Sequence, residues 1–349
     1  MIHLDALLQD LDQLCKTTSN DTIAAIIDRI NADLHFVRHE DDMRIIVEHI
    51  LDSPVFQDVG KCLAALAFST DLTQDRGLMY IRISVLFHFG TRLPNVFRRL
   101  AQNDWMSFLK EVLLLPDLGE VLDPIDVICN QNYADLGYVE VHISHIAVLL
   151  LEKLCLIHEM SLSELDEIDV PLLSHLCEMV ESSRDTDETY NYAVIKLLIC
   201  LNSQLAKKRG FTLTRNRFLD VLALRVNHSK TLTENLIFVF NRANSEELQL
   251  SITWLLISIF ENEPTRYLFY TNDLTVILDI AMREIQRVHD DNEELQHALV
   301  SLLPLVANSG ALEASRKQVY DILTLLKESK FVKPSTRRLA QRVLVGFSV

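Results

Sequence analysis

The chain has 349 residues, of which 49% are hydrophobic and 23% are charged, and its formal net charge at pH 7 is −16. This length and hydrophobic content predict a packed globular protein of roughly two domains and exclude a disordered chain. The acidic balance argues against general nucleic-acid binding, which needs a basic surface. Glycine and proline number only 8 each, and such sparse punctuation between Leu-rich segments indicates a mostly helical chain.

The first 16 residues, MIHLDALLQDLDQLCK, mix acidic with apolar side chains and lack the basic start and long apolar run of a signal peptide. The longest apolar stretches, such as WLLISIF at 254–260, are too short to span a bilayer. Six cysteines lie far apart inside apolar segments, without a C-x-x-C pair, which predicts reduced core residues of an intracellular protein. They are Cys15, Cys62, Cys129, Cys155, Cys177 and Cys200. We therefore expect a cytoplasmic protein without a transmembrane segment.

Acidic and basic residues are unevenly distributed along the chain. Residues 117–188 hold 17 acidic and 2 basic side chains, 207–230 hold 7 basic and one acidic, and 310–349 hold 8 basic and 3 acidic. Solvated helix faces and loops would account for these runs. The alternative is an acidic flank and a basic flank that orient a partner electrostatically.

Short breaks rich in Ser, Asn, Asp and Thr separate the predicted helices, and such side chains cap the helix that follows. These breaks lie at 19–22, 51–54, 261–264 and 333–336. The longer stretch 116–137 contains two prolines and two glycines, and ESSRDTDET at 181–189 is polar and acidic. We take the second as the boundary between an N-terminal acidic helical half, 1–184, and a C-terminal leucine-rich half, 185–349.

In the C-terminal half, apolar residues recur at three- and four-residue steps, the pattern of one helix face. The segments are 194–205, 248–259, 274–285 and 295–306. No alternating strand or hairpin pattern is present. Many helices with short links fit either a bundle or a stack, and the length of the chain favours the stack. We predict an all-α, armadillo- or HEAT-like helical solenoid.

The sequence contains no motif of a known catalytic centre. All eight glycines stand alone, which excludes a Gly-rich phosphate loop, and neither H-E-x-x-H nor G-x-S-x-G occurs. The pairs His35/His39 and His142/His145 each share a helix face, but two histidines are too few for a zinc site. We predict a protein that is not an enzyme, holds no cofactor or metal, and binds other proteins along the solenoid face.

Four segments carry a resemblance to a known family. They are YNYAVIKLLICLNSQ (190–204), ENLIFVFNR (234–242), FYTNDLTVILDI (269–280) and REI (283–285). In this order and spacing the chain resembles the leucine-rich domain of the WISH/DIP/SPIN family over residues 185–330. Members of that family are armadillo-like cytoplasmic adaptors of cortical actin. They bind and activate the actin-related protein 2/3 complex without a preformed filament.

The resemblance implies that this chain seeds linear actin filaments, which prime branching at cortical, endocytic actin patches. Its partner would be the actin-related protein 2/3 complex, and it would act on actin filaments indirectly. The chain lacks the Src-homology-3 domain and proline-rich segments of larger relatives, and it has no tryptophan-acidic tail that would deliver actin monomers. Phe240 stands where the family has Leu, and Ser203 stands where it has an acid.

The aromatic and polar residues of the third segment have a structural and a functional interpretation. Asn272 and Asp273 come just before a helical pattern that starts at Leu274, so we expect them to cap that helix. The aromatic side chains before them are expected to pack under the turn. These are Tyr267, Phe269 and Tyr270. The family-motif residues, which we expect to be structural, are Tyr270, Asn272, Asp273, Asn235, Asn241 and Arg242.

Arg283 and Arg287, four residues apart on one helix face and followed by His289, form our first candidate for a partner-binding surface. An internal ion pair of Arg283, which is followed by Glu284, to a neighbouring repeat is an equal alternative. The second candidate is a basic segment that we expect to be an exposed loop. Its residues are Lys207, Lys208, Arg209, Arg215 and Arg217. A generic armadillo-like adaptor for cargo, a ubiquitin ligase or a membrane surface remains the alternative function.

Overall fold

A computed structural model describes most of the chain. The described residues are 2–16, 21–37, 39–66, 75–103, 105–115, 131–182, 188–207, 216–287, 292–330 and 332–347. Within these ranges every regular element is a helix and no strand is present, so the predicted all-α class is confirmed. The chain divides into two compact units, Met1–Glu167 and Ile168–Val349. The predicted boundary at 184/185 lies outside the described residues and stays a prediction.

The first unit is built around α5 (Arg76–Arg92), which packs against helices that precede and follow it in sequence. Its other elements are α1 (Ile2–Leu14), α2 (Thr22–Ala32), η1 (Leu34–Phe36), α3 (Glu40–Leu51), η2 (Pro54–Gln57), α4 (Val59–Ala65), α6 (Asn95–Leu100), α7 (Trp105–Leu113), α10 (Gln131–Ile157) and α11 (Leu162–Glu167). Gly90 of α5 lies against the ring of Phe97 in α6, where any Cβ would overlap that ring. Glycine is therefore required at this crossing.

One carboxylate joins α3 to α10 in the first unit. Glu40 Oε1 lies 2.8 Å from His145 Nδ1 and 3.1 Å from His142 Nδ1. Hydrogen bonds to His142 and then to His145 hold the pKa of Glu40 far below its ordinary value. The predicted His142/His145 pair therefore contacts an acid that the sequence did not indicate. Among the described residues no group of three or more His, Cys, Asp or Glu could hold a metal ion.

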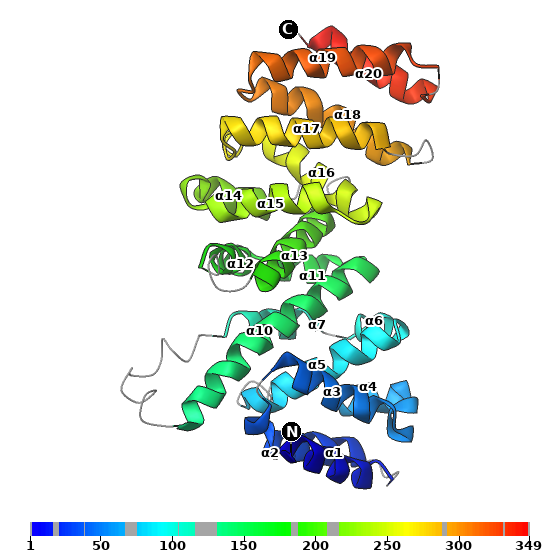
Figure 1. The fold of residues 1–349 in the computed structure, drawn as a ribbon, viewed down its shortest axis with the longest axis vertical. Coiled ribbons are helices and arrows are strands. Elements are labelled where there is room, and N and C mark those ends of the chain that lie inside the picture. The colour runs from blue at the N-terminus through cyan, green and yellow to red at the C-terminus, as the bar shows by residue number, and fades with distance from the viewer. Residues whose placement is uncertain are drawn as a thin grey trace. The chain divides into compact units, whose positions relative to one another are not determined.

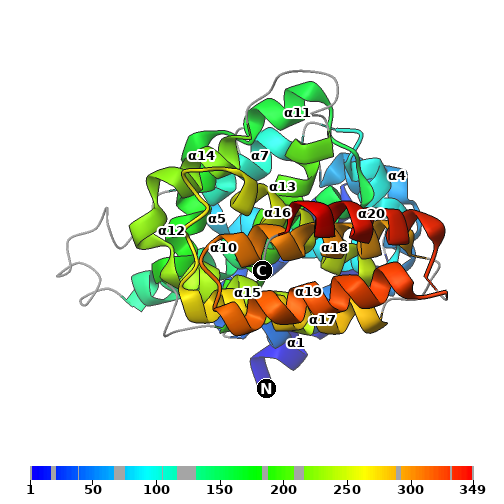
Figure 2. The ribbon, with the colours of Figure 1, turned by 90° about the horizontal axis from the view of Figure 1, so that it is seen from above.

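The second unit is a stack of paired helices (Figure 1). Its elements are α12 (Val170–Ser182), α13 (Glu188–Lys207), α14 (Arg217–Leu224), η5 (Val226–His228), α15 (Lys230–Arg242), α16 (Glu246–Glu261), α17 (Thr271–Arg287), α18 (Glu293–Asn308), α19 (Glu313–Glu328) and α20 (Pro334–Gly346). Helices α12, α15, α17 and α19 pack on one another in one row, and α13, α16, α18 and α20 in a second row. Figure 2 looks down this stack, with α15, α17 and α19 along one side and α16, α18 and α20 along the other. This arrangement confirms the predicted helical solenoid.

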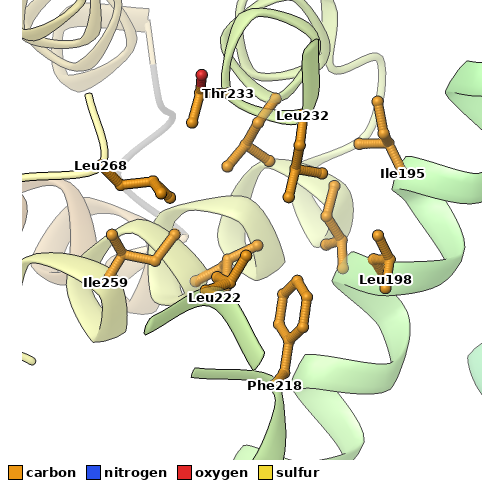
Figure 3. A pocket seen from close by; sticks show the side chains of 11 residues that line it. Ile195, Leu198, Phe218, Leu222, Leu232, Thr233, Ile259 and Leu268 are labelled. Atoms are coloured by element: carbon orange, nitrogen blue, oxygen red, sulfur yellow. The ribbon is translucent and has the colours of Figure 1, made fainter. Parts of the chain in front are cut away.

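The apolar periodicity of the sequence becomes the core between the two rows. The five periodic positions of α17, for example, are all buried: Leu274, Ile277, Leu278, Ala281 and Ile285. Side chains of α13 to α16 and of the turn after α16 converge in Figure 3, among them Leu198, Phe218, Leu222 and Leu268. The cavity that they leave is only about 10 Å³. It is a packing defect of a dry core rather than a ligand site.

Five of the six cysteines are buried thiols, as predicted, and Cys129 lies outside the described residues. Burial raises the pKa of the Cys62 thiol to about 11 and that of the Cys177 thiol to about 12. These two thiols are therefore protonated at neutral pH and are poor nucleophiles. In the part of the chain that the structure describes, no helix is both long enough and apolar enough to cross a membrane.

Candidate protein-binding surface

The two arginines of the first candidate share a single carboxylate on α17. Arg283 Nε donates to Glu284 Oε1 at 3.0 Å, and Arg287 Nη1 lies 3.4 Å from the same oxygen. The Glu284 side chain is 16% exposed, whereas Arg283 is 45% and Arg287 is 69% exposed. Arg283 is thus paired with a carboxylate of its own helix, not with a charged residue of a neighbouring repeat as in the alternative that we considered. Both guanidinium groups nevertheless remain open to solvent.

Asn241 fixes this arginine pair to the neighbouring helix pair. Its Oδ1 accepts a hydrogen bond from Arg283 Nη2 at 2.9 Å, which connects α15 to α17. Arg283 is thus held at two of its nitrogen atoms, by Glu284 and by Asn241. A guanidinium group that is already held in position loses less conformational entropy when a partner binds.

The other motif residues also connect successive helices. Asn235 Nδ2 of α15 donates to Asn191 Oδ1 at 2.8 Å, and Asn191 Nδ2 of α13 donates to the carbonyl of Val180 at 2.8 Å. The Arg242 guanidinium lies 4.2 Å from the centre of the Phe238 ring. That ring stacks on Tyr192 of α13 at 4.7 Å. The family segments at 190–204, 234–242 and 283–285 are therefore in direct contact.

The third segment begins a helix earlier than we expected. Helix α17 starts at Thr271, so Asn272 and Asp273 lie in its first turn rather than before it. The Tyr270 N–H donates to Asp273 Oδ2 at 3.0 Å, which is half of a capping box. Asp273 thus makes a capping contact from inside the helix. Asn272 is exposed.

The prediction for the three aromatic residues is right for one of them and wrong for two. Phe269 is buried and stacks on Phe260 at 5.5 Å between ring centres. Tyr267 and Tyr270 are 69% and 66% exposed. Leu268 and Phe269 together fill the inside of the turn, so the residues on either side of them point to solvent. The phenolic hydroxyl makes this exposure tolerable for tyrosine.

The two tyrosines belong to one edge of the second unit. Helices α17 and α19 pack in the same row, and Tyr270 and Leu312 immediately precede their first residues. Leu312 is 53% exposed, and Leu224, at the end of α14, is 80% exposed. We call Leu224, Tyr267, Tyr270 and Leu312 the aromatic edge. In Figure 1 the turns before α17 and α19 lie on the same side of the stack.

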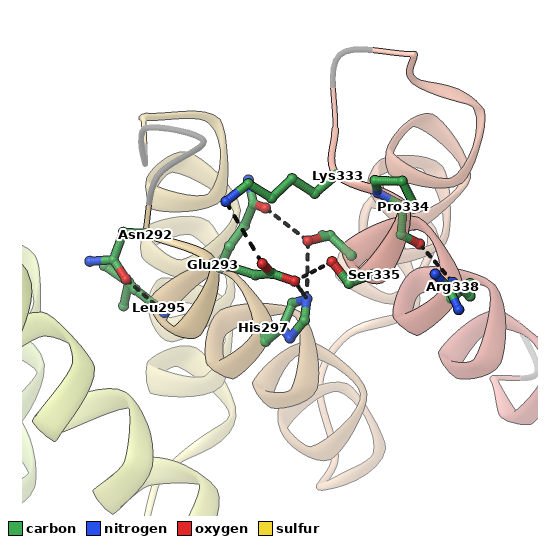
Figure 4. Close-up of polar contacts among 10 residues, drawn as sticks. Asn292, Glu293, Leu295, His297, Lys333, Pro334, Ser335 and Arg338 are labelled. Atoms are coloured by element: carbon green, nitrogen blue, oxygen red, sulfur yellow. Dashed lines mark hydrogen bonds and ion pairs between the residues drawn. The ribbon is translucent and has the colours of Figure 1, made fainter.

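The opposite edge holds the first residues of α16, α18 and α20, where the structure describes a group of polar side chains. We call the residues Ser245, Glu246, Asn292, Glu293 and Ser335 the polar edge. Figure 4 shows the part between α18 and α20, where Ser335 donates to Glu293. This contact and the nearby Lys333 and His297 lower the pKa of Glu293. Thr336 Oγ1 donates to Gln296 Oε1 at 3.0 Å.

This network corrects the prediction for the break at 333–336. We expected its hydroxyl residues to cap the helix that follows. Helix α20 instead starts at Pro334 after Lys333, and Ser335 and Thr336 lie in its first turn, where their hydroxyls bind α18. The hydroxyl residues of this break do make hydrogen bonds, but they make them to α18 of the preceding repeat instead of capping α20. Spacing along one helix could not reveal a contact between two helices.

A cleft of about 190 Å³ lies beside Arg287 at the polar edge. Its walls come from the turn between α15 and α16 and from α16, α17 and α18. The lining residues are Ala243, Asn244, Ser245, Glu246, Gln249, Glu284, Arg287 and Leu295. Asn292 contacts two of these lining residues, because its Oδ1 accepts from the Leu295 N–H and its Nδ2 donates to Glu246 at 2.6 Å.

The second basic candidate is only partly described. Arg217 lies in the first turn of α14 rather than in an exposed loop, and its Nη1 donates to the carbonyl of Ile168 at 3.3 Å. Asn216 caps this helix through the N–H of Phe218, which is why the loop ends one residue earlier than expected. Lys207 ends α13. Lys208, Arg209, Arg215 and His289 lie outside the described residues and stay predictions.

These features define a class of protein. Stacked helix pairs with polar contacts running from repeat to repeat, and with exposed arginine and tyrosine side chains at the edges, are typical of armadillo-like proteins that bind other proteins. Residues 187–320 match the family model described as SPIN90/Ldb17, leucine-rich domain. This match over residues 187–320 confirms the resemblance inferred from the four segments.

Curated relatives are similar over about half of this chain. Protein dip1 of Schizosaccharomyces pombe is 29% identical over 170 residues, 47% of this chain and 45% of the relative. Protein LDB17 of Saccharomyces cerevisiae is 30% identical over 197 residues, 55% and 39% of the two chains. Protein LDB17 of Eremothecium gossypii is 28% identical over 191 residues, 53% and 40% of the two chains. The matched segment thus spans less than half the length of each relative.

Proposed function

We propose that this protein is a non-enzymatic activator of the actin-related protein 2/3 complex, which it binds without a preformed filament to nucleate linear actin filaments. The observation that carries the proposal is the SPIN90/Ldb17 leucine-rich domain at 187–320. The resemblance of its four segments to the WISH/DIP/SPIN family supplies the partner and the activity. The place of action that follows is the cytoplasmic cell cortex, at actin patches where the linear filaments seed branched networks.

The binding surface in this proposal is the face of α17 that carries Arg283 and Arg287. Both guanidinium groups are exposed, and Glu284 and Asn241 hold Arg283 in place. Arginine is enriched among residues that dominate interface energies, because its planar fork pairs with carboxylates and stacks on aromatic rings. A partner surface that offers such groups would bind here with little rearrangement of the chain.

Activation requires more than binding. The two actin-related subunits of the complex must come to lie side by side like a filament end. The protein favours that arrangement only if it binds it more tightly than the splayed one. To move the equilibrium from 1:99 to 99:1, the preference must be about 10⁴-fold. Equal affinity for both states would give tight binding without nucleation.

The test is a pyrene-actin assembly assay with the purified complex and this protein, without preformed filaments or another activator. Microscopy of the products follows filament shape. The expected result is faster assembly and unbranched filaments. Binding without faster assembly would overturn nucleation and leave an adaptor that docks on actin machinery. Absence of binding would overturn the proposed function as a whole.

A further inference from the structure

Helix α16 leaves a tryptophan uncovered on its outer face. Trp254 is 43% exposed, and Ser251 and Ser258, about one turn away on either side, are too small to cover its ring. The other tryptophan of the chain, Trp105, is fully buried. Tryptophan is among the residue types enriched where a few side chains dominate the binding energy of a protein interface. Trp254 is therefore a candidate anchor for a partner.

Hydrogen bonds at the polar edge keep α16, α18 and α20 in register. Asn292, just before α18, donates to Glu246, the first residue of α16. Ser335, the second residue of α20, donates to Glu293, the first residue of α18. Because the three helices also pack on one another along the row, they start level and run in the same direction. Positions equally far from the start of each helix are therefore neighbours.

The ninth residues of the three helices are Trp254, Ser301 and Arg342. Ser301 is half-buried and Arg342 is exposed. The seventh residues are all fully buried, as expected if the three helices turn the same face to the core. They are Ile252, Leu299 and Ala340. Helices that pack side by side have axes about 8–10 Å apart, so about 20 Å separates the aromatic end of this line, Trp254, from its cationic end, Arg342.

The cationic end has no counter-charge on its own helix. Helix α20 contains no acidic residue. Arg338 lies one turn before Arg342, and its Nε donates to the carbonyl of Pro334 at 3.3 Å. Arg342 makes no hydrogen bond or ion pair with the residues that the structure describes. Two guanidinium groups at this spacing attract carboxylates, which they bind through paired N–H groups.

Exposed glutamates on the same face decide between an acidic chain and an anionic membrane. Glu247 and Glu261 lie seven residues before and after Trp254, and Glu294 lies seven residues before Ser301. At 1.5 Å per residue each glutamate is about 10 Å from the line of ninth residues, which is about the screening length at physiological salt. A flat anionic membrane would cover the glutamates and the arginines alike. A single chain that follows the line passes between the glutamates and meets only the arginines.

We propose that the outer face of α16, α18 and α20 binds an extended acidic segment of another protein, with a large apolar side chain on Trp254 and carboxylates on Arg338 and Arg342. An extended chain covers about 20 Å in about six residues, so the apolar residue and the acids are about six positions apart. The three helices belong to the second row, whereas Arg283 and Arg287 belong to the first row (Figure 2). The inference therefore does not rest on the proposed function.

The first experiment uses the fluorescence of Trp254 in the full chain. A synthetic peptide in a Gly/Ser background carries one Leu and, about six positions further along, two Glu. Its titration should give a saturable blue shift of the tryptophan emission, with a Kd of about 1 mM or tighter. Trp254→Ala should abolish the shift, because Trp105 is already buried. Peptides with Lys in place of Glu, or Ala in place of Leu, should bind at least about 10-fold more weakly.

The second experiment exchanges the charges. Arg338→Glu with Arg342→Glu should weaken the acidic peptide at least about 10-fold and should strengthen the Lys peptide, a gain that a misfolded protein would not show. Arg98→Glu with Arg99→Glu, two exposed arginines of α6, gives the same change in net charge and should leave both affinities unchanged.

Four results would overturn the inference. They are no shift with the acidic peptide, equal affinity for the acidic and the Lys peptide, equal losses in the two double variants, and no gain of the Lys peptide in Arg338→Glu with Arg342→Glu. A shift with vesicles rich in phosphatidylserine but not with the peptide would assign the face to a membrane. A shift that grows with protein concentration alone would assign it to a second copy of the chain. Both assignments would replace the acidic segment.

Discussion

The two edges of the second unit solve the problem of helix ends in different ways. At the polar edge, Ser245 and Asn292 accept hydrogen bonds from the N–H groups of Leu248 and Leu295, at 3.2 and 3.1 Å. At the aromatic edge, Tyr270 and Leu312 stand at the same positions before α17 and α19 and bring no capping oxygen. The aromatic edge thus gives up a stabilising contact that the polar edge uses twice.

At the aromatic edge, two arginine side chains donate hydrogen bonds to carbonyl groups at the ends of helices. Arg266 Nε donates to the carbonyl of Phe260 at 3.1 Å, and Arg316 Nη1 donates to the carbonyl of Ala307 at 3.3 Å. The ends of α16 and α18 are therefore satisfied in the same way in two successive repeats. The start of α19 has no side-chain cap from Leu312, and the start of α17 has the contact between Asp273 and the Tyr270 N–H instead. A surface that binds a partner often keeps exposed apolar side chains at some cost in stability, and we expect the aromatic edge to be such a surface.

The largest effect should come from reversing the charges of the α17 arginines. Arg283→Glu with Arg287→Glu places three acids together and removes two interface candidates, so affinity for the complex should fall at least about 30-fold, or about 2 kcal/mol. Pull-down and pyrene-actin assays measure this. Lys317→Glu with Lys327→Glu, two exposed charge reversals on α19, is the control with the same change in net charge. Equal losses in both proteins would show that only net charge matters and would remove α17 from the proposed surface.

A smaller effect should follow from breaking the polar network between α18 and α20. Thr336 is fully buried, and Thr336→Val leaves Gln296 without its donor. The free energy of unfolding should fall by about 1–3 kcal/mol in urea denaturation. Thr324→Val removes a hydroxyl that only bonds back to Tyr320 of its own helix, and it should cost less than about 0.5 kcal/mol. A similar cost for both variants would mean that the contact between helices adds nothing.

Exchanging the capping residues of the two edges sharpens the comparison further. Asn292→Ala should destabilise the protein by about 1 kcal/mol, and Leu312→Ser should stabilise it by about 0.5–1 kcal/mol, because a serine at that position can accept from the free N–H groups of α19. Thermal denaturation of both variants gives the comparison. If Leu312→Ser destabilises the protein, the exposed leucine contributes to packing and the aromatic edge is structural.

The smallest effect concerns pH. The pKa of Glu293 is lowered in the folded protein, first by the hydrogen bond from Ser335. A depressed carboxyl pKa contributes stability above the unfolded pKa, near 4.5, and that stability is lost as pH falls through the folded value. The difference in stability between wild type and Glu293→Gln should therefore be constant from pH 7 to about 5 and shrink below that. A difference that grows in acid would contradict this assignment of the proton.

Periodicity was sufficient to predict the helices of the second unit, because each is decided by its own apolar face. The five apolar positions of α17 and those of α18 are buried as the three- and four-residue spacing requires. The motif residues were also found from sequence, although their contacts were not. Asn235 meets Asn191, and Asn241 meets Arg283, across 44 and 42 positions of the chain.

What the sequence could not predict depends on contacts between repeats. The exposure of Tyr267 and Tyr270 follows from how Leu268 and Phe269 fill a turn, and no spacing rule encodes that choice. Gln249 is one glutamine in an apolar helix, and only the fold places it in a cleft with Arg287. Its neighbours in sequence, from Leu248 to Phe260, are mostly apolar but also include Ser251, Thr253 and Ser258.

The cross-linking of α16, α18 and α20 at the polar edge has a mechanical consequence. Glu246–Asn292 joins α16 to α18, and Glu293–Ser335 joins α18 to α20, both at the polar edge. Among the described residues, no side-chain hydrogen bond links the start of α17 at Tyr270 to the start of α19 at Leu312. We expect the repeats to hinge about the polar edge, so that the spacing between them changes most at the aromatic edge. The distance between Tyr270 and Leu312 would then vary most, and a partner seated across it would set the curvature of the whole row.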